Sequence, residues 1–142
     1  MAPKIEGVVL TPAEELFTHS DERRDLTEIF STKGEGDFLA RQAKILRIKK
    51  PCVLGNHWHT YREMFFVADG LARFTLEEVD EEGAFTGKED HLLVYKNGRI
   101  LMPAGIAHVV NMDEGILLGY TEEPYSGNDN KYDFDAHQTV TE

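Results

Sequence analysis

Short β-prone segments separated by turn signals recur through the second half of this chain. Between them stand Asp-Gly, Asn-Gly and Pro-Ala-Gly sequences, which favour tight turns over helices. Many short strands with almost no helical pattern are typical of an antiparallel sandwich or barrel. The sequence therefore predicts an all-β fold. The expected strands lie at 38–49, 63–67, 72–79, 91–95, 99–102, 108–112 and 116–121.

The N-terminal part has a different pattern. Residues 11–18 are typical of a short helical turn, with Thr11 as its cap, Pro12 at the first helical position and Glu14 as a capping-box carboxylate. We expect a first strand to follow at 26–30. The fold prediction is therefore a β-barrel preceded by one short helical turn.

The size of the chain fits one domain with an ordinary hydrophobic core. It has 142 residues, of which 41% are hydrophobic. We expect a single domain over 1–142, with the core barrel at about 24–121 and a C-terminal tail at 122–142. No apolar run approaches the roughly 20 residues that span a bilayer, and the N-terminus has no signal-peptide pattern. A single cysteine, Cys52, agrees with a reducing compartment, so we expect a cytoplasmic protein.

The charge is strongly acidic and uneven. The net charge is −11, and residues 51–142 hold six Lys and Arg against seventeen Asp and Glu. Such a chain is a poor candidate for binding nucleic acid or an anionic membrane over a broad surface. A small anionic ligand needs only two or three local cations, although the same basic residues also suit a solvated strand face. The candidates are Arg41, Lys44, Arg47, Lys49 and Lys50.

Four residues have the pattern of a metal site. His57 and His59 are two apart, so on an extended strand both imidazoles project from one face, and Glu63 keeps the same parity if that strand continues or bulges once. His108 follows a Pro-Ala-Gly turn and opens a later strand, which a closed barrel can bring to the same place. Imidazole and carboxylate ligands suit a divalent transition metal. The remaining histidines lack this context and are expected at the surface or in turns: His19, His91 and His137.

Two stretches resemble the conserved motifs of the cupin superfamily. The first motif is matched by His57, His59, Glu63 and Gly70, and the second by Gly98, Pro103, Gly105, His108 and Asn111, with one residue fewer at two gaps. The resemblance covers about residues 38–121. It implies the RmlC-like cupin fold, a small double-stranded β-helix or jelly-roll barrel with the metal site in its mouth.

A narrower resemblance points to cupins that act on nucleotide-linked deoxysugars. Residues 21–30 resemble the entry segment of the dTDP-4-keto-6-deoxysugar epimerases and 3,4-ketoisomerases, with Arg24 in place of the usual glycine. Residues 55–59 resemble the metal-carrying cupin domain of bifunctional capsular-polysaccharide epimerases, and 120–125 and 131–134 resemble the endings of these sugar enzymes. The metal-free ketoisomerases generally lack the second-motif histidine. Because His108 is present, the resemblance favours the metal-binding subgroup.

This resemblance implies an epimerase or isomerase of a 4-keto-6-deoxy nucleotide sugar, in polysaccharide or deoxysugar biosynthesis. Such an enzyme needs a base of near-neutral pKa and stabilisation of an enolate oxygen. His57, His59 and Tyr61 are the candidate proton-transfer residues, although metal binding and proton transfer compete for the two histidines. We expect Arg41 and Arg47 to share a strand face and hold the diphosphate.

Two other functions stay open. A mononuclear metal-dependent dioxygenase would use the same three His and one Glu, and a non-catalytic sugar-binding cupin would need the metal only for stability. The ligand set suits Zn, Fe, Ni and Mn alike. We also expect a homodimer, from the family and from strand edges that need cover.

Overall fold

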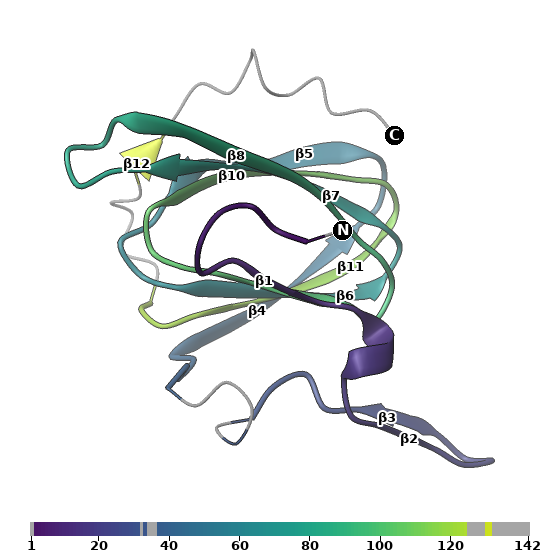
Figure 1. Ribbon diagram of the computed structural model, residues 1–142. Coiled ribbons are helices and arrows are strands. Elements are labelled where there is room, and N and C mark those ends of the chain that lie inside the picture. The colour runs from purple at the N-terminus through teal and green to yellow at the C-terminus, as the bar shows by residue number, and fades with distance from the viewer. Residues whose placement is uncertain (1, 32, 34–36, 125–129, 132–142) are drawn as a thin grey trace.

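Two antiparallel sheets face each other and enclose the core (Figure 1). The computed structural model describes residues 2–31, 33, 37–124 and 130–131. The first sheet has the order β1 (Val9–Thr11), β9 (Arg99–Met102), β6 (Glu63–Asp69), β11 (Gly115–Thr121) and β4 (Gln42–Ile48). The second sheet has the order β12 (Asn130–Lys131), β5 (Cys52–Trp58), β10 (Ile106–Met112), β7 (Ala72–Val79) and β8 (Phe85–Val94).

The alternation of side chains along the strands explains this pairing. On β7, Phe74 and Leu76 are fully buried in the core between the sheets, and on the facing sheet Phe65, Val67 and Leu117 do the same from β6 and β11. Burying each such side chain contributes about 1.5–3 kcal/mol. The apolar face of each sheet is therefore covered by the other, as in a jelly roll.

In Figure 1, the N-terminal segment runs from the β8 side of the barrel to β1. Ile5 and Val8 belong to the core cluster. The buried carboxylate of Asp90 on β8 accepts hydrogen bonds from the backbone N–H groups of Lys4 and Ile5, both at 2.8 Å. The segment then continues into β1, which pairs with β9. The barrel therefore begins at Val9 and not near residue 24, because the long-range pairing of β1 brings it into the first sheet.

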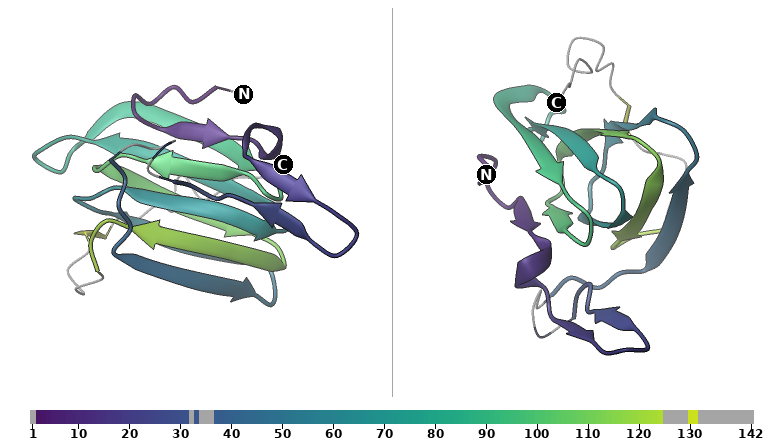
Figure 2. Two further views of the ribbon diagram at one scale, coloured as in Figure 1. Left: turned by 90° about the horizontal axis from the view of Figure 1, so that it is seen from below. Right: turned by 90° about the vertical axis from the view of Figure 1, so that its right-hand side faces the viewer.

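The connection between β1 and β4 covers part of the outer face of the first sheet. It holds the 3-10 turn η1 (Ala13–Glu15) and a hairpin of β2 (Thr18–Ser20) and β3 (Asp25–Thr27), which projects from the barrel in Figure 2. The Phe30 ring packs edge-on against Tyr120 and Phe38, with ring centroids 5.1 and 5.5 Å apart. Arg99 donates to the Ile29 carbonyl. These contacts anchor the connection to the sheet.

Two N-terminal predictions were wrong in detail, the capping of the helical turn and the first strand. The turn η1 has Pro12 at its N-cap and no side-chain cap, because Thr11 is committed to β1. The strand expected at 26–30 is only the short β3, which pairs with β2 and lies outside both sheets.

Most of the expected tail, including His137 and the 131–134 side chains, lies outside the described residues, which resume only for the backbone of β12.

Within the described ranges, the chain has no helix long and apolar enough to cross a membrane.

Candidate metal centre

The chain passes from the second sheet to the first sheet between His57 and Glu63. β5 of the second sheet ends at Trp58, and β6 of the first sheet begins at Glu63. His59 lies in the corner between them. The parity argument for Glu63 was therefore wrong, because no single strand carries all three side chains. Glu63 reaches His59 across the corner instead.

A β-bulge sets the position of His57. Along the pairing of β5 with β10, His108 is opposite His57 and Val109 is opposite Gly55, so one residue, Asn56, is extra on β5. Asn56 has φ +72° and Gly55 has φ +96°, both in the left-handed region. A Cβ at Gly55 would lie 2.6 Å from the His108 carbonyl oxygen. The bulge therefore requires glycine at position 55. Because Asn56 is an extra residue on β5, His57 and not Asn56 lies opposite His108.

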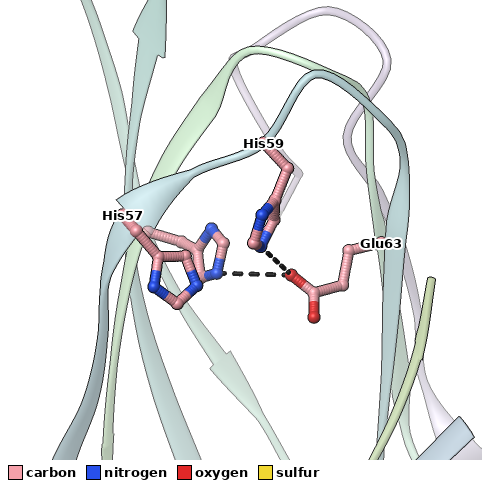
Figure 3. Close-up of side chains that lie close together, drawn as sticks. His57, His59 and Glu63 are labelled. Atoms are coloured by element: carbon pink, nitrogen blue, oxygen red, sulfur yellow. Dashed lines mark ion pairs between the residues drawn. The ribbon is translucent and has the colours of Figure 1, made fainter. Parts of the chain in front are cut away.

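The four predicted ligands converge at the corner between β5 and β6, and Figure 3 labels three of them, His57, His59 and Glu63. One potential ligand atom from each of His57, His59, Glu63 and His108 lies within 4.8 Å of all the others. Glu63 Oε1 lies 3.0 Å from His59 Nε2 and 3.3 Å from His108 Nε2. His59, Glu63 and His108 are buried, and His57 is half-buried. We call these four residues the quartet.

The donor set of the quartet fits a divalent ion. Two ligands about 2.1 Å from one ion lie at most about 4.2 Å apart, so the widest pair needs to close by only about half an ångström. Glu63 Oε1 is buried and accepts no hydrogen bond from the described residues. The His108 Nδ1–H donates to the Ile106 carbonyl at 3.1 Å, which leaves Nε2 as a lone-pair donor directed at the quartet. A metal ion would satisfy these inward-facing atoms.

Burial and mutual contact shift the titration of the quartet. Burial lowers the pKa of His108 below its usual value, because the charged imidazolium is poorly solvated there, although the Glu63 carboxylate acts in the opposite direction. Burial alone would raise the pKa of Glu63, but its contact with His59 and the charges of His108 and His59 outweigh that effect and lower it. Neutral imidazole and ionised carboxylate are the forms that bind a metal.

Tyr61 and Arg62 lie in the corner beside the quartet. The Tyr61 ring is half-buried and stacks on His59, with ring centroids 4.7 Å apart and planes 17° apart. Arg62 donates through Nε to Glu122 at 3.0 Å and through Nη1 to Asp37 at 3.0 Å. Arg62 therefore ties the corner to the end of β11 and to the connection that precedes β4. Its role was not predicted, since its partners are 60 and 25 residues away.

The two arginines expected to bind diphosphate do not share a strand face in the barrel. Arg41 precedes β4 and is exposed near Glu123 at 4.0 Å. Arg47 is opposite Ile116, on the outer face of the first sheet. The interior positions of β4 are instead Leu46, Ile48 and Lys44, which have the other parity. Sequence parity alone does not select this face, because β4 also has Ala43 and Ile45 at the outward positions; the pairing of Leu46 with the buried Leu117 of β11 does.

The other described histidines lie away from the quartet. The side chains of His19 and His91 are 57% and 52% exposed, and each lies near a neighbouring carboxylate, Asp21 at 3.9 Å and Glu89 at 3.3 Å. Both are surface residues, as expected.

Comparisons with known proteins give matches among solved structures only. No family model and no curated protein sequence matches this chain. A double mutant of the 3,4-ketoisomerase of Thermoanaerobacterium thermosaccharolyticum, solved with TDP, is 18% identical with a TM-score of 0.73, over 93% of this chain and 91% of that chain. The dTDP-4-dehydrorhamnose 3,5-epimerase of Bacillus anthracis, solved with TDP and PPi, is 15% identical with a TM-score of 0.74, over 88% and 78%.

A Mycobacterium tuberculosis RmlC epimerase is 16% identical with a TM-score of 0.76, over 90% of this chain and 69% of that chain. Identities this low establish a common fold and nothing finer. Two facing antiparallel sheets, both sequence motifs and these structural matches agree. The chain therefore has the cupin-type jelly-roll fold that is found in dTDP-sugar epimerases and 3,4-ketoisomerases.

Proposed function

We propose that this protein binds one divalent transition metal ion through the quartet and is an epimerase or isomerase of a 4-keto-6-deoxy nucleotide sugar. The observation that carries the proposal is the convergence of His57, His59, Glu63 and His108 inside a barrel whose fold occurs in dTDP-sugar enzymes. The matching enzymes of Thermoanaerobacterium thermosaccharolyticum and Bacillus anthracis were solved with TDP. The metal identity, Zn, Fe, Ni or Mn, stays open because three His and one Glu suit all four.

The reaction moves a proton next to a ketone. A base removes the α-proton, the C–H electron pair forms a carbon–carbon double bond, and the ketone oxygen becomes an enolate oxygen. Return of a proton to the other face of the same carbon gives the epimer. Return to the former carbonyl carbon gives the ketone isomer, when the hydroxyl on the first carbon passes its proton to the enolate oxygen and becomes the new ketone. A bound metal ion would supply Lewis-acid stabilisation of such an oxygen. Tyr61, beside His59, is the candidate proton-transfer residue that does not compete for the metal.

The test is solvent deuterium incorporation into a dTDP-4-keto-6-deoxy sugar, measured by mass spectrometry. We expect incorporation with the purified protein, a loss of at least 100-fold in Tyr61→Phe, and metal content close to one ion per chain by elemental analysis. Tyr61→Phe keeps the ring that stacks on His59, so metal content stays unchanged in that variant. Absence of incorporation with the whole set of 4-keto-6-deoxy sugars would refute the proposal.

A second candidate function is a mononuclear metal-dependent dioxygenase. The specific observation in its favour is the composition of the quartet, because four protein ligands leave coordination positions for both substrate and oxygen on a six-coordinate ion. This function requires substrate-dependent oxygen uptake that a chelator abolishes. If neither deuterium incorporation nor oxygen uptake occurs, and TDP still binds, the protein is a non-catalytic sugar-binding cupin.

We also propose a cytoplasmic homodimer. β4 is an edge strand of the first sheet, and Ile45 on its outer face and Leu39 before it are 49% and 62% exposed. Exposed edges and apolar side chains of this kind favour pairing with a second copy. Sedimentation at micromolar concentration tests this proposal, and a monomer would contradict it.

A further inference from the structure

Lys44 is a basic residue on the interior face of the barrel near the quartet. It is opposite Gly119 on β11, and Gly119 is in turn opposite Phe65 on β6. A Cβ at Gly119 would lie 3.1 Å from Lys44 Cε and 3.2 Å from Phe65 Cε1. The lysine stem therefore runs across Gly119 towards the Phe65 ring. Because Phe65 lies two residues after Glu63, both side chains of β6 point into the same interior.

The glycine at position 119 makes this course possible. A side chain there would occupy the space between the Lys44 stem and the Phe65 ring, where the nearest atoms leave only 3.1–3.2 Å. Lysine commonly packs its methylene stem along apolar surface while its ammonium reaches a polar environment. Phe65 supplies that surface and belongs to the buried core.

Lys44 lies on the same face of the first sheet as Glu63 of the quartet, because Glu63 is opposite Thr121 and Lys44 is opposite Gly119, two residues earlier on β11. Lys44 remains exposed as a whole residue, and within the described part of the chain it forms no ion pair. The neighbouring cation Arg47 has the opposite orientation, on the outer face. Of these two cations of β4, Lys44 is therefore the one on the interior face.

We propose that Lys44 is an anion-binding residue of the barrel interior, which holds an anionic oxygen of the ligand that the quartet contacts. The identity of that ligand as a nucleotide sugar rests on the proposed function. Two sources of such an oxygen exist in that substrate: the diphosphate, which is charged throughout, and the enolate oxygen, which carries charge only after proton removal. An ammonium stabilises either one by direct charge pairing in a partly dry site.

The experiment compares Lys44→Met, Lys44→Arg and the control Arg47→Met, which removes the same charge from the outer face of the same strand. TDP and inorganic pyrophosphate are titrated by calorimetry into the purified proteins, with metal content matched among the variants. Deuterium incorporation into a dTDP-4-keto-6-deoxy sugar supplies kcat and KM. Thermal melting confirms that each variant is folded.

A diphosphate role predicts that Lys44→Met weakens TDP and pyrophosphate binding by about tenfold or more, with partial recovery in Lys44→Arg and less than a twofold change in Arg47→Met. An enolate role predicts unchanged TDP binding and a fall in kcat of at least 100-fold at constant KM. If Lys44→Met matches Arg47→Met in both assays, the proposal is overturned. If TDP binding depends on Lys44 but no deuterium is incorporated by the unmodified protein, the anion-binding role stands and the proposed reaction fails.

Discussion

Gly55 is the residue whose replacement by alanine tests the geometry of the metal centre most directly. Its φ of +96° and the bulge that it forms with Asn56 set the pairing of His57 with His108. In Gly55→Ala, the new Cβ would lie 2.6 Å from the His108 carbonyl oxygen, whereas ordinary contact begins at 3.4 Å. The backbone at His108 therefore has to retreat by about 0.8 Å, the difference between these two distances.

The expected cost has two parts. A residue with a Cβ in the left-handed region costs about 1–2 kcal/mol. Overlap in a well-packed site costs about 1–3 kcal/mol more. We therefore expect Gly55→Ala to lower the free energy of unfolding by about 2–5 kcal/mol, a large share of the roughly 5–15 kcal/mol that is typical of a domain. Displacement of His108 also weakens metal binding. Removing a residue that orients a metal ligand typically lowers the metal affinity by about 10- to 100-fold, and we expect a loss of similar size here.

Gly87 provides a matched control within the same sheet. Its φ is +91°, close to that of Gly55, but a Cβ there meets no atom within 4 Å. Gly87→Ala therefore incurs only the backbone cost of about 1–2 kcal/mol and leaves metal affinity unchanged. The assays are urea unfolding of the metal-free proteins, followed by calorimetric titration with Zn²⁺ and Mn²⁺.

The difference between the two variants isolates the contact with His108. We expect Gly55→Ala to be about 1–3 kcal/mol less stable than Gly87→Ala. Equal losses of stability together with equal metal affinities would show that the bulge does not position His108, and the account of the metal centre given above would be wrong.

Three further predictions concern the quartet and its surroundings. Metal at about 100 times its Kd should raise the free energy of unfolding by about 2.7 kcal/mol, and thermal melting of His108→Ala should show little of this gain; an equal gain in that variant would place the ion elsewhere. In the metal-free protein, the pKa of buried His108 is lowered, so the unfolded chain binds a proton at a higher pH than the folded chain does. The contribution of His108 to the free energy of unfolding is therefore complete above pH 6.5 and declines below it. Urea unfolding that is unchanged between pH 7 and pH 5 would contradict this. Replacing Arg62 by Met should lower the free energy of unfolding by about 1–3 kcal/mol, because Glu122 and Asp37 lose charge-assisted hydrogen bonds. Arg23→Met, which removes an exposed ion pair, should lower it by less than about 0.5 kcal/mol. Similar losses in both variants, measured by urea unfolding, would show that Arg62 does not hold the corner in place.

Much of the β structure was predictable because its signals are local. Strand propensity at 72–79 and 116–121, and the turn residues between strands, depend on side chains a few positions apart. The structure confirms β7 and β9 with the predicted bounds. The metal-site argument assumed an extended strand at His57 and His59, and β5 supplies it only as far as Trp58. β1 was not predicted, since it has only three residues and depends on pairing with β9, about 90 residues further along.

The orientation of the cations was the least predictable feature of the site. Arg41, Lys44 and Arg47 differ little in chemistry, and only the pairing of β4 with β11 decides which one faces the core. A shift of register by one residue would have exchanged the faces of Lys44 and Arg47. That register depends on Gly119 and Leu117, which lie far from β4 in the sequence.

The sequence by itself determined the kinds of ligand at the metal centre and the β character of the fold, because ligand chemistry depends on single residues and turn propensity on neighbouring ones. The convergence of His57, His59, Glu63 and His108 was decided by the tertiary structure, through a strand that changes sheets and a bulge that shifts a register. Both depend on hydrogen bonds and packing between segments about 50 residues apart. Such long-range contacts form only when the two sheets pack on their common core, because bringing distant segments together costs chain entropy that the packing has to offset.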